Sequence, residues 1–415
     1  MYGAVDLMVV GKFGSAADIS AVSTGAQVMT TLTTVIVGLS MGTTILLGRQ
    51  IGEKKTKDAG RTIGASIYLF MILGLILTIL MQFAAPAAVR LMKAPEEAFS
   101  RTVAYVRICS GGALFIVAFN ILGSVFRGIG NSKMPLVAVA IACVTNIFGD
   151  LLLVAVFPLG TAGAAIATVF AQALSVALSV IIIRKQSLPF EFRLSMVRGD
   201  GELIRRVTQL GLPIAFQDLL VSISFLVITA IVNSLGLIAS AGVGVAEKIC
   251  GFIMLVPSAF MQSMSAFVAQ NFGAHKMDRA YKALRAGIVT SLTFGVIMGY
   301  FAFFHGRVLA FAFAKDPEVI SAAAAYLKAY AIDCLLVSFL FCFIGFYNGL
   351  GRTKFVMLQG IAGSFGVRIP VSFFMSRIRP VSLFMIGLAT PCSTSVQIIL
   401  CFIMLAVVKK AEQKS

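Results

Sequence analysis

Five acidic residues lie inside long apolar runs, where a charged side chain is costly. The chain has 17 Asp and Glu residues, and the others fall in polar segments or near the ends of apolar runs. A carboxylate at the centre of a membrane helix costs about 2.5–3.5 kcal/mol on insertion scales. Each of the five is therefore a candidate functional group: Asp6, Asp150, Asp218, Glu247 and Asp333.

The first half of the chain offers a possible proton or cation site. Asn146 precedes Asp150 by one helical turn, so both side chains share one helix face. Asp6, Asn120 and Thr168 lie in other apolar runs. If these groups converge, they form an oxygen-rich site suited to a proton or a hard monovalent cation, and Na⁺ would take Asp6, Asn146 and Asp150. For Asn120 and Thr168 alone, hydrogen bonding between membrane helices is the simpler explanation.

The composition indicates an all-α integral membrane protein, because 59% of the 415 residues are hydrophobic and 12% are charged. A soluble fold cannot cover that much apolar surface. Barrel strands alternate polar and apolar residues, and these runs do not. The runs predict about twelve membrane helices at 1–13, 19–48, 62–92, 102–126, 134–158, 161–183, 210–234, 239–269, 286–314, 320–347, 354–376 and 380–408.

The net charge of +17 is explained by orientation. Of the 34 Lys and Arg residues, 22 fall in one alternate set of loops and the tail, and nine fall in the other set. The richer set is cytoplasmic by the positive-inside rule, which puts both termini inside and removes the argument for nucleic-acid binding. The seven cysteines form no CxxC pair and there are two histidines, so we expect no zinc site and no cofactor.

Two loops repeat at an offset of 221 residues. Gly48-Arg-Gln-Ile-Gly52 corresponds to Ala269-Gln-Asn-Phe-Gly273, and Gly128-Ile-Gly130 corresponds to Gly349-Leu-Gly351. The repeat predicts two six-helix lobes, at 1–190 and 210–415, joined by a cytoplasmic linker at 191–209. The same offset places the start of the first helix upstream of Met1, so we expect that helix to be truncated.

The second lobe differs chemically from the first. The positions equivalent to Asn146 and Asp150 are Val367 and Val371, so the acidic site is not repeated. A buried base, Arg368, lies between those two valines and could pair with an acid. The remaining polar groups are candidates for substrate contacts or for structural pairing: Asp218, Glu247, Asp333 and Arg368.

Enzymatic functions are disfavoured. No GxxxxGK[ST] loop is present, so ATP-driven export by this chain alone is not expected. An intramembrane aspartyl protease could use Asp6 and Asp150, but Ile147 occupies the first glycine position of the usual Gly-x-Gly-Asp context, ahead of Phe148-Gly-Asp150. We therefore expect a protein that is not an enzyme; a channel or scaffold is a weaker alternative.

The chain resembles the multidrug and toxic compound extrusion (MATE) transporters of bacteria over nearly its whole length. The resembling segments include Val5-Asp6, Arg127-Gly-Ile-Gly-Asn-Ser-Lys133, Asn146-Ile-Phe-Gly-Asp150, Gly163-Ala-Ala-Ile-Ala-Thr168 and Gln270-Asn-Phe-Gly-Ala274. The resemblance implies two six-helix lobes forming a V around a central cleft. It also implies an acidic network in the first lobe that carries over to Asp6, Asn120, Asn146, Asp150 and Thr168. Some members carry an acid about eleven residues into helix seven; Val221 stands there in this chain, with Asp218 nearby.

The function implied by this resemblance is secondary active efflux. A monomer in the bacterial inner membrane, in contact with lipids, would export organic cationic or amphipathic drugs in exchange for H⁺ or Na⁺ by alternating access. The alternative is a lipid-linked precursor flippase of related architecture. A flippase would line its cleft with several bases, and the bases within apolar runs are Arg107, Lys248 and Arg368.

Overall fold

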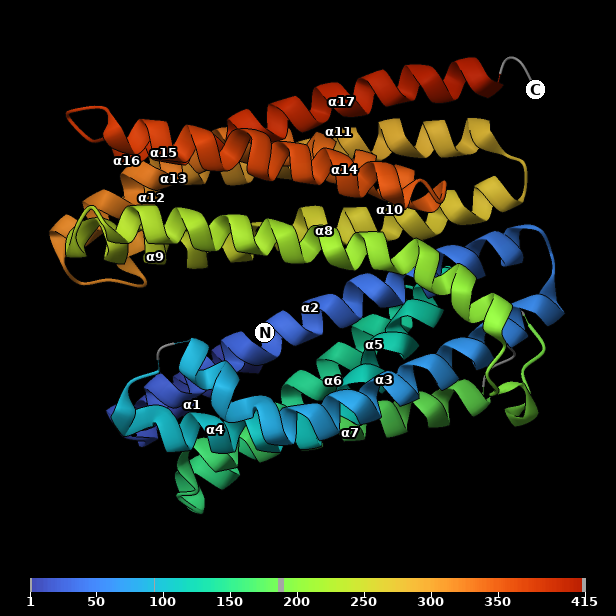
Figure 1. The fold of residues 1–415 in the computed structure, drawn as a ribbon, viewed down its shortest axis with the longest axis horizontal. Coiled ribbons are helices and arrows are strands. Elements are labelled where there is room, and N and C mark those ends of the chain that lie inside the picture. The colour runs from blue at the N-terminus through green and yellow to red at the C-terminus, as the bar shows by residue number, and fades with distance from the viewer. Residues whose placement is uncertain (1, 93, 186–189, 413–415) are drawn as a thin grey trace. The chain divides into compact units, whose positions relative to one another are not determined.

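The computed structural model describes residues 2–92, 94–185 and 190–412, and the fold there is helical. By chain contacts it divides into two units, Met1–Ala215 and Phe216–Ser415. Figure 1 shows long helices joined by short loops in each of them. The predicted division into lobes at 1–190 and 210–415 differs from these units in one respect, because the segment from 190 to 215 packs with the first unit.

The predicted all-α membrane fold is confirmed. Ten helices, some of them interrupted, are long and apolar enough to cross a membrane, and a bent pair raises the number to eleven in the described part of the chain. The bent pair, α4 (Glu96–Gly111) and α5 (Ala113–Gly128), meets at 52° where one span was predicted over 102–126. Its bend falls at Gly111-Gly112, where glycine weakens a helix. The twelfth predicted segment, at 1–13, is the short helix α1 (Tyr2–Phe13).

The first unit contains α1 to α7, η1, η2 and the beginning of α8. The elements run in this order: α1 (Tyr2–Phe13), α2 (Ala16–Gly52), α3 (Thr56–Leu91), α4 (Glu96–Gly111), α5 (Ala113–Gly128), α6 (Lys133–Asp150), the π-helical η1 (Leu151–Val156), α7 (Gly160–Lys185), the 3-10 turn η2 (Leu194–Met196) and α8 (Gly201–Asn233). Helix α2 packs against α3, α4 and α5. Of its most apolar 18-residue stretch, 61% is buried, so α2 is the central helix of this unit.

The second unit is organised around α13. The elements after α8 are α9 (Leu237–Ile253), α10 (Leu255–Gly273), α11 (Met277–Phe304), α12 (Gly306–Phe311), α13 (Pro317–Gly349), α14 (Thr353–Gly363), the π-helical η3 (Ser364–Arg368), α15 (Ile369–Arg377), α16 (Leu383–Gly387) and α17 (Ala389–Glu412). Helix α13 contacts α9, α10, α11 and α17, and 72% of its most apolar 18-residue stretch is buried. A helix that is apolar on all sides is expected at such a central position.

Small residues let α2 and the beginning of α8 touch backbone to backbone. Gly38 and Gly42 form a GxxxG pair on α2, opposite Gly211 and Ala215 on α8. A Cβ atom added at Gly42 would overlap the carbonyl oxygen of Val207 and lie 2.8 Å from the backbone nitrogen of Gly211. Because lipid is as apolar as a side chain, such close packing is a main source of helix association in a membrane. This contact attaches the start of α8 to the first unit.

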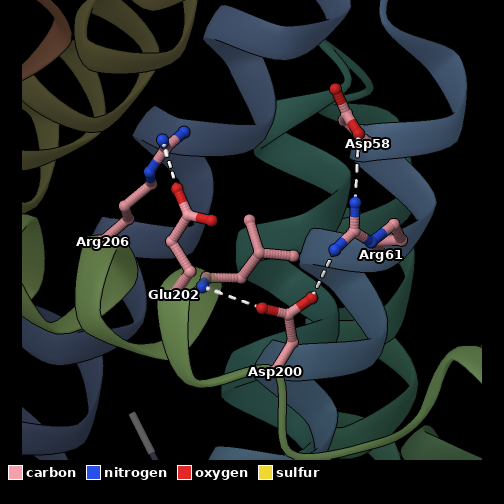
Figure 2. A network of polar contacts seen from close by, with 6 residues as sticks. Asp58, Arg61, Asp200, Glu202 and Arg206 are labelled. Carbon is pink, nitrogen blue, oxygen red and sulfur yellow. Dashed lines mark hydrogen bonds and ion pairs between the residues drawn. The ribbon is translucent and has the colours of Figure 1, made fainter.

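The segment 190–200, which precedes α8, is fastened to the beginning of α3. Added Cβ atoms at Gly60 and Gly64 would overlap the carbonyl oxygens of Glu191 and Met196, so these two glycines leave room for the linker backbone. Figure 2 shows Asp200 accepting a 2.7 Å contact from Arg61, which also faces Asp58 at 3.7 Å. The Arg61 guanidinium holds the pKa of Asp200 below its usual value, so Asp200 is ionised at neutral pH.

Replacing Gly42 by alanine should destabilise the protein, because the new methyl group meets backbone atoms that cannot rotate away. Overpacking of this kind costs about 1–3 kcal/mol. The matched control is Gly244→Ala on α9, where an added Cβ meets nothing within 4 Å and alanine favours the helix. The midpoint of thermal unfolding in detergent, at one scan rate, should fall for Gly42→Ala and stay level or rise for Gly244→Ala. Equal midpoints would contradict the close contact.

Replacing Asp200 by asparagine should loosen the segment 190–200. The Arg61 side chain is 42% exposed, so the pair contributes at most about 1 kcal/mol, and amide hydrogen exchange should accelerate by at most about five-fold. Asp58→Asn, at the longer distance, should change the exchange less. The pair's contribution is complete above the usual carboxyl pKa and is lost as the pH falls through the lowered value of the folded state. Unchanged exchange at pH 7 in Asp200→Asn would exclude this fastening role.

Candidate functional site

The first unit buries a polar cluster where four helices meet. Asp6 comes from α1, Tyr105 from α4, Asn146 and Asp150 from α6, and Thr168 from α7. Asp6, Asn146 and Asp150 are fully buried, and Thr168 is 8% exposed. The structure thus brings together four of the five residues proposed for the first-lobe site, from three separate apolar segments.

Asp6 is the acceptor at the centre of this cluster. Asn146 donates from Nδ2 to Asp6 Oδ1 at 3.1 Å. The hydroxyls of Thr168 and Tyr105 both donate to Asp6 Oδ2 at 3.0 Å. Both carboxyl oxygens of Asp6 therefore have partners, and the three donors come from three different helices.

Asp150 lies beside Asp6, and the two carboxyl groups interact. Neither oxygen of Asp150 has a hydrogen-bond donor among the described residues, and the same is true of Asn146 Oδ1. Two ionised carboxylates in contact repel each other strongly in a buried setting. The three unpartnered atoms are all acceptors, so the cluster is suited to accept a proton or a cation. Carboxylate, amide and hydroxyl oxygens are the ligands that Na⁺ would take.

Two local features of the sequence place Asn146 and Asp150 in the cluster: their four-residue spacing and the π-helical turn that follows α6. Asn146 and Asp150 are four residues apart, so they face the same side of α6. Asp150 is the last residue of α6, and the π-helical η1 begins at Leu151. Single π-helical turns occur often at functional sites because they re-aim side chains.

Asn120 lies apart from the acidic cluster. Its Nδ2 donates at 2.8 Å to the carbonyl oxygen of Ile116, one turn earlier on α5. Together with Arg127 and Ser179 it borders a small cavity of about 50 Å³. No contact between Asn120 and Asp6 is present in the structure as described, so its participation in coupling stays a prediction.

Tyr105 is a site residue that sequence reasoning missed. It is 2% exposed and donates to Asp6 across 99 positions of the sequence. Nothing in its local pattern distinguishes it from other aromatic residues on buried helix faces. Only the placement of α4 against α1 and α7 makes it a partner of the acid.

The four polar residues proposed for the second lobe border one cavity in the second unit. This cavity has a volume of about 510 Å³. Asp218 comes from α8, Glu247 from α9, Asp333 from α13 and Arg368 from η3. Arg368 forms no direct ion pair with a described carboxylate within 4.0 Å, but Asp333 interacts with it electrostatically from a longer distance.

A metal centre of the usual kind is not formed by the described residues. They contain no group of three or more His, Cys, Asp and Glu side chains that could hold a metal ion. Any cation in the first unit would therefore depend on the mixed oxygen set of Asp6, Asn146, Asp150 and Thr168.

Comparison with known proteins gives one consistent answer. The MatE family model matches residues 1–152 and 213–374. The probable multidrug resistance protein YoeA of Bacillus subtilis is 24% identical over 405 residues, covering 96% of this chain and 88% of YoeA. The multidrug export protein MepA of Staphylococcus saprophyticus is 26% identical over 382 residues, covering 91% and 83%.

The solved structures show the same fold. The crystal structure of MATE in complex with MaL6 superposes with a TM-score of 0.93 at 19% identity, covering 100% of this chain and 93% of that one. An outward-facing multidrug resistance MATE family transporter gives the same TM-score and identity and covers 92% of its own chain. The family model covers well over half of the sequence, and the predicted resemblance is confirmed: the chain belongs to the multidrug and toxic compound extrusion (MatE) family.

Proposed function

We propose that the protein is a secondary active efflux transporter that exports organic cationic or amphipathic molecules in exchange for H⁺ or Na⁺. The observation that carries this proposal is the contact between Asp150 and Asp6, with both Asp150 oxygens unpartnered inside an apolar unit. Relatives named for multidrug resistance and multidrug export support the substrate class.

The buried acid pair supplies the coupling chemistry. A proton shared between the two carboxyl groups, or a Na⁺ ion between them, removes the repulsion and satisfies the unpartnered oxygens. When the cation leaves, one negative charge is added where α1, α4, α6 and α7 meet. Since Asp6 holds donors from three of these helices, the change in charge acts on their packing.

Coupling requires that the cation favours one conformation over another. A ligand shifts a conformational equilibrium only by its difference in affinity for the two states. We propose that the cation-bound first unit favours the conformation with low affinity for the exported molecule. Alternating access by the two repeats, which the six-plus-six organisation supports, then releases the molecule outside.

The flippase alternative loses support from the placement of the bases. Arg107 and Lys248 are exposed, and Arg368 alone of the three borders the cavity of the second unit. A single guanidinium beside three carboxyl groups does not make the basic lining that a polyanionic lipid-linked precursor would require.

Replacing Asp150 by asparagine should abolish cation-driven efflux and leave the protein folded. Asparagine keeps the size of the side chain but can neither titrate nor supply a carboxylate to Na⁺. The measurement is efflux of ethidium from proteoliposomes with an imposed pH gradient or an imposed Na⁺ gradient, one at a time. We expect a loss of at least about ten-fold in initial rate, because charged contacts of this kind contribute about 1.5–3 kcal/mol.

The matched control is Asp278→Asn, an exposed carboxylate in the first turn of α11. It should transport at the rate of the unmodified protein, and both variants should show the same thermal unfolding midpoint within experimental error. Efflux by Asp150→Asn at the unmodified rate, under both gradients, would refute the coupling role of the acid pair. The gradient that drives efflux in the unmodified protein identifies the coupling ion.

A further inference from the structure

The cavity of the second unit has the size of a small-molecule site. Its volume of about 510 Å³ falls within the range of roughly 300–1,000 Å³ typical of ligand pockets. Most of its wall is apolar and includes Met254, Met261, Tyr330 and Phe341. The charged groups on the wall come from separate elements, so the fold, and no single helix, gathers them.

Arg368 is held in a fixed position on this wall. It is 5% exposed, and its guanidinium carbon lies 4.4 Å from the centre of the Phe225 ring. Its Nη1 donates to the hydroxyl of Ser224 at 3.1 Å. The π-helical η3 ends at Arg368, and Pro370 follows in the first turn of α15. The ring and the hydroxyl therefore orient the guanidinium without neutralising it.

Arg368 has no ion pair in the described structure, although the charge of Asp333 on the same wall attracts it. Its Nε has no acceptor, and no described carboxylate lies within 4.0 Å of its nitrogen atoms. An unpaired buried charge is strongly unfavourable, so its presence on a cavity wall points to a partner that comes and goes. A guanidinium is suited to a carboxylate, which it binds with two parallel hydrogen bonds.

The same cavity also carries acids. Asp333 is 1% exposed and its Oδ1 has no donor among the described residues, while Glu247 accepts a contact from Thr229 at 3.3 Å. Asp218 completes the set. A simple anion would be repelled by the three carboxyl groups, and a simple cation would be repelled by the guanidinium. A molecule that carries both charges can pair its carboxylate with Arg368 and its cationic group with the acids.

We infer that the second-unit cavity binds an aromatic zwitterion, with Arg368 holding its carboxylate and the cavity acids holding its cationic nitrogen groups. Arg368 is then the specificity-determining residue that separates zwitterions from plain organic cations. The inference deepens the proposed function, on which it rests for the view that the bound molecule is the one exported. Binding itself needs no transport, so the two claims can be tested apart.

The test uses three dyes with one xanthene framework and different charges. Rhodamine 110 carries a free carboxylate and a cationic ring system, rhodamine 123 is its methyl ester and therefore a cation, and fluorescein lacks the amino groups and is an anion. Fluorescence anisotropy measures the dissociation constant of each with the purified full-length protein in detergent. We expect rhodamine 110 to bind about ten- to a hundred-fold more tightly than rhodamine 123, and fluorescein to bind more weakly than rhodamine 110.

The variant Arg368→Gln should remove the preference for rhodamine 110 and should bind rhodamine 123 at least as well as before, which shows that it is folded. Arg377→Gln is the matched control, because Arg377 is exposed near the end of the same stretch of helix and does not border the cavity. It should keep the full preference. If Arg368→Gln does not fold, Ser224→Ala keeps the charge and removes the hydroxyl that orients it, and should reduce the preference by a few-fold.

Equal affinities for the two rhodamines in the unmodified protein, or no binding of either, would overturn the inference. So would a preference that persists in Arg368→Gln, or fluorescein binding as tightly as rhodamine 110, which would indicate a simple anion site. Asp150→Asn separates the two proposals, since it should lose coupled efflux and keep the dye preference. A preference without coupled efflux in the unmodified protein would refute the proposed function and leave this inference standing.

Discussion

The contact between the carboxyl groups of Asp6 and Asp150 constrains the whole first unit. Two negative charges in one dry site repel each other strongly, which is why we propose that the cluster holds a proton or a cation. The polar residues around the pair distribute their hydrogen bonds unevenly between the two acids. Asn146, Thr168 and Tyr105 all donate to Asp6 and none donates to Asp150, which leaves one acid fixed and the other available to exchange.

The second unit differs by a buried base within the same repeated architecture. The first unit gathers acceptors around two acids, whereas the second places the guanidinium of Arg368 on a cavity wall that also carries three carboxyl groups. In both units the polar group adjoins a π-helical turn, η1 after Asp150 and η3 ending at Arg368. The two halves thus present different charges beside an interrupted helix, and we propose that one half binds an inorganic cation and the other an organic molecule.

The long apolar runs were enough to predict twelve helical segments, because membrane helices must satisfy their backbone groups internally. The four-residue spacing of Asn146 and Asp150 was enough to place both on one face. The bend between α4 and α5 was missed because a hydropathy pattern does not report the direction of the helix axis. In the sequence, only Gly111-Gly112 indicates a weak point there. Tyr105 and the isolation of Arg368 could not be predicted, since each depends on which helices become neighbours far apart in sequence.

The seam between Gly38 and Gly42 on α2 and Gly211 and Ala215 on α8 has an evolutionary consequence. Elsewhere on these helices one aliphatic residue can replace another with little penalty, so drift leaves few traces. At Gly38, Gly42 and Gly211, any side chain larger than hydrogen pushes two backbones apart. A lineage that acquires bulk at position 42 is therefore expected to compensate near position 207 or 211, and covariation between these positions across relatives would record the contact without a structure.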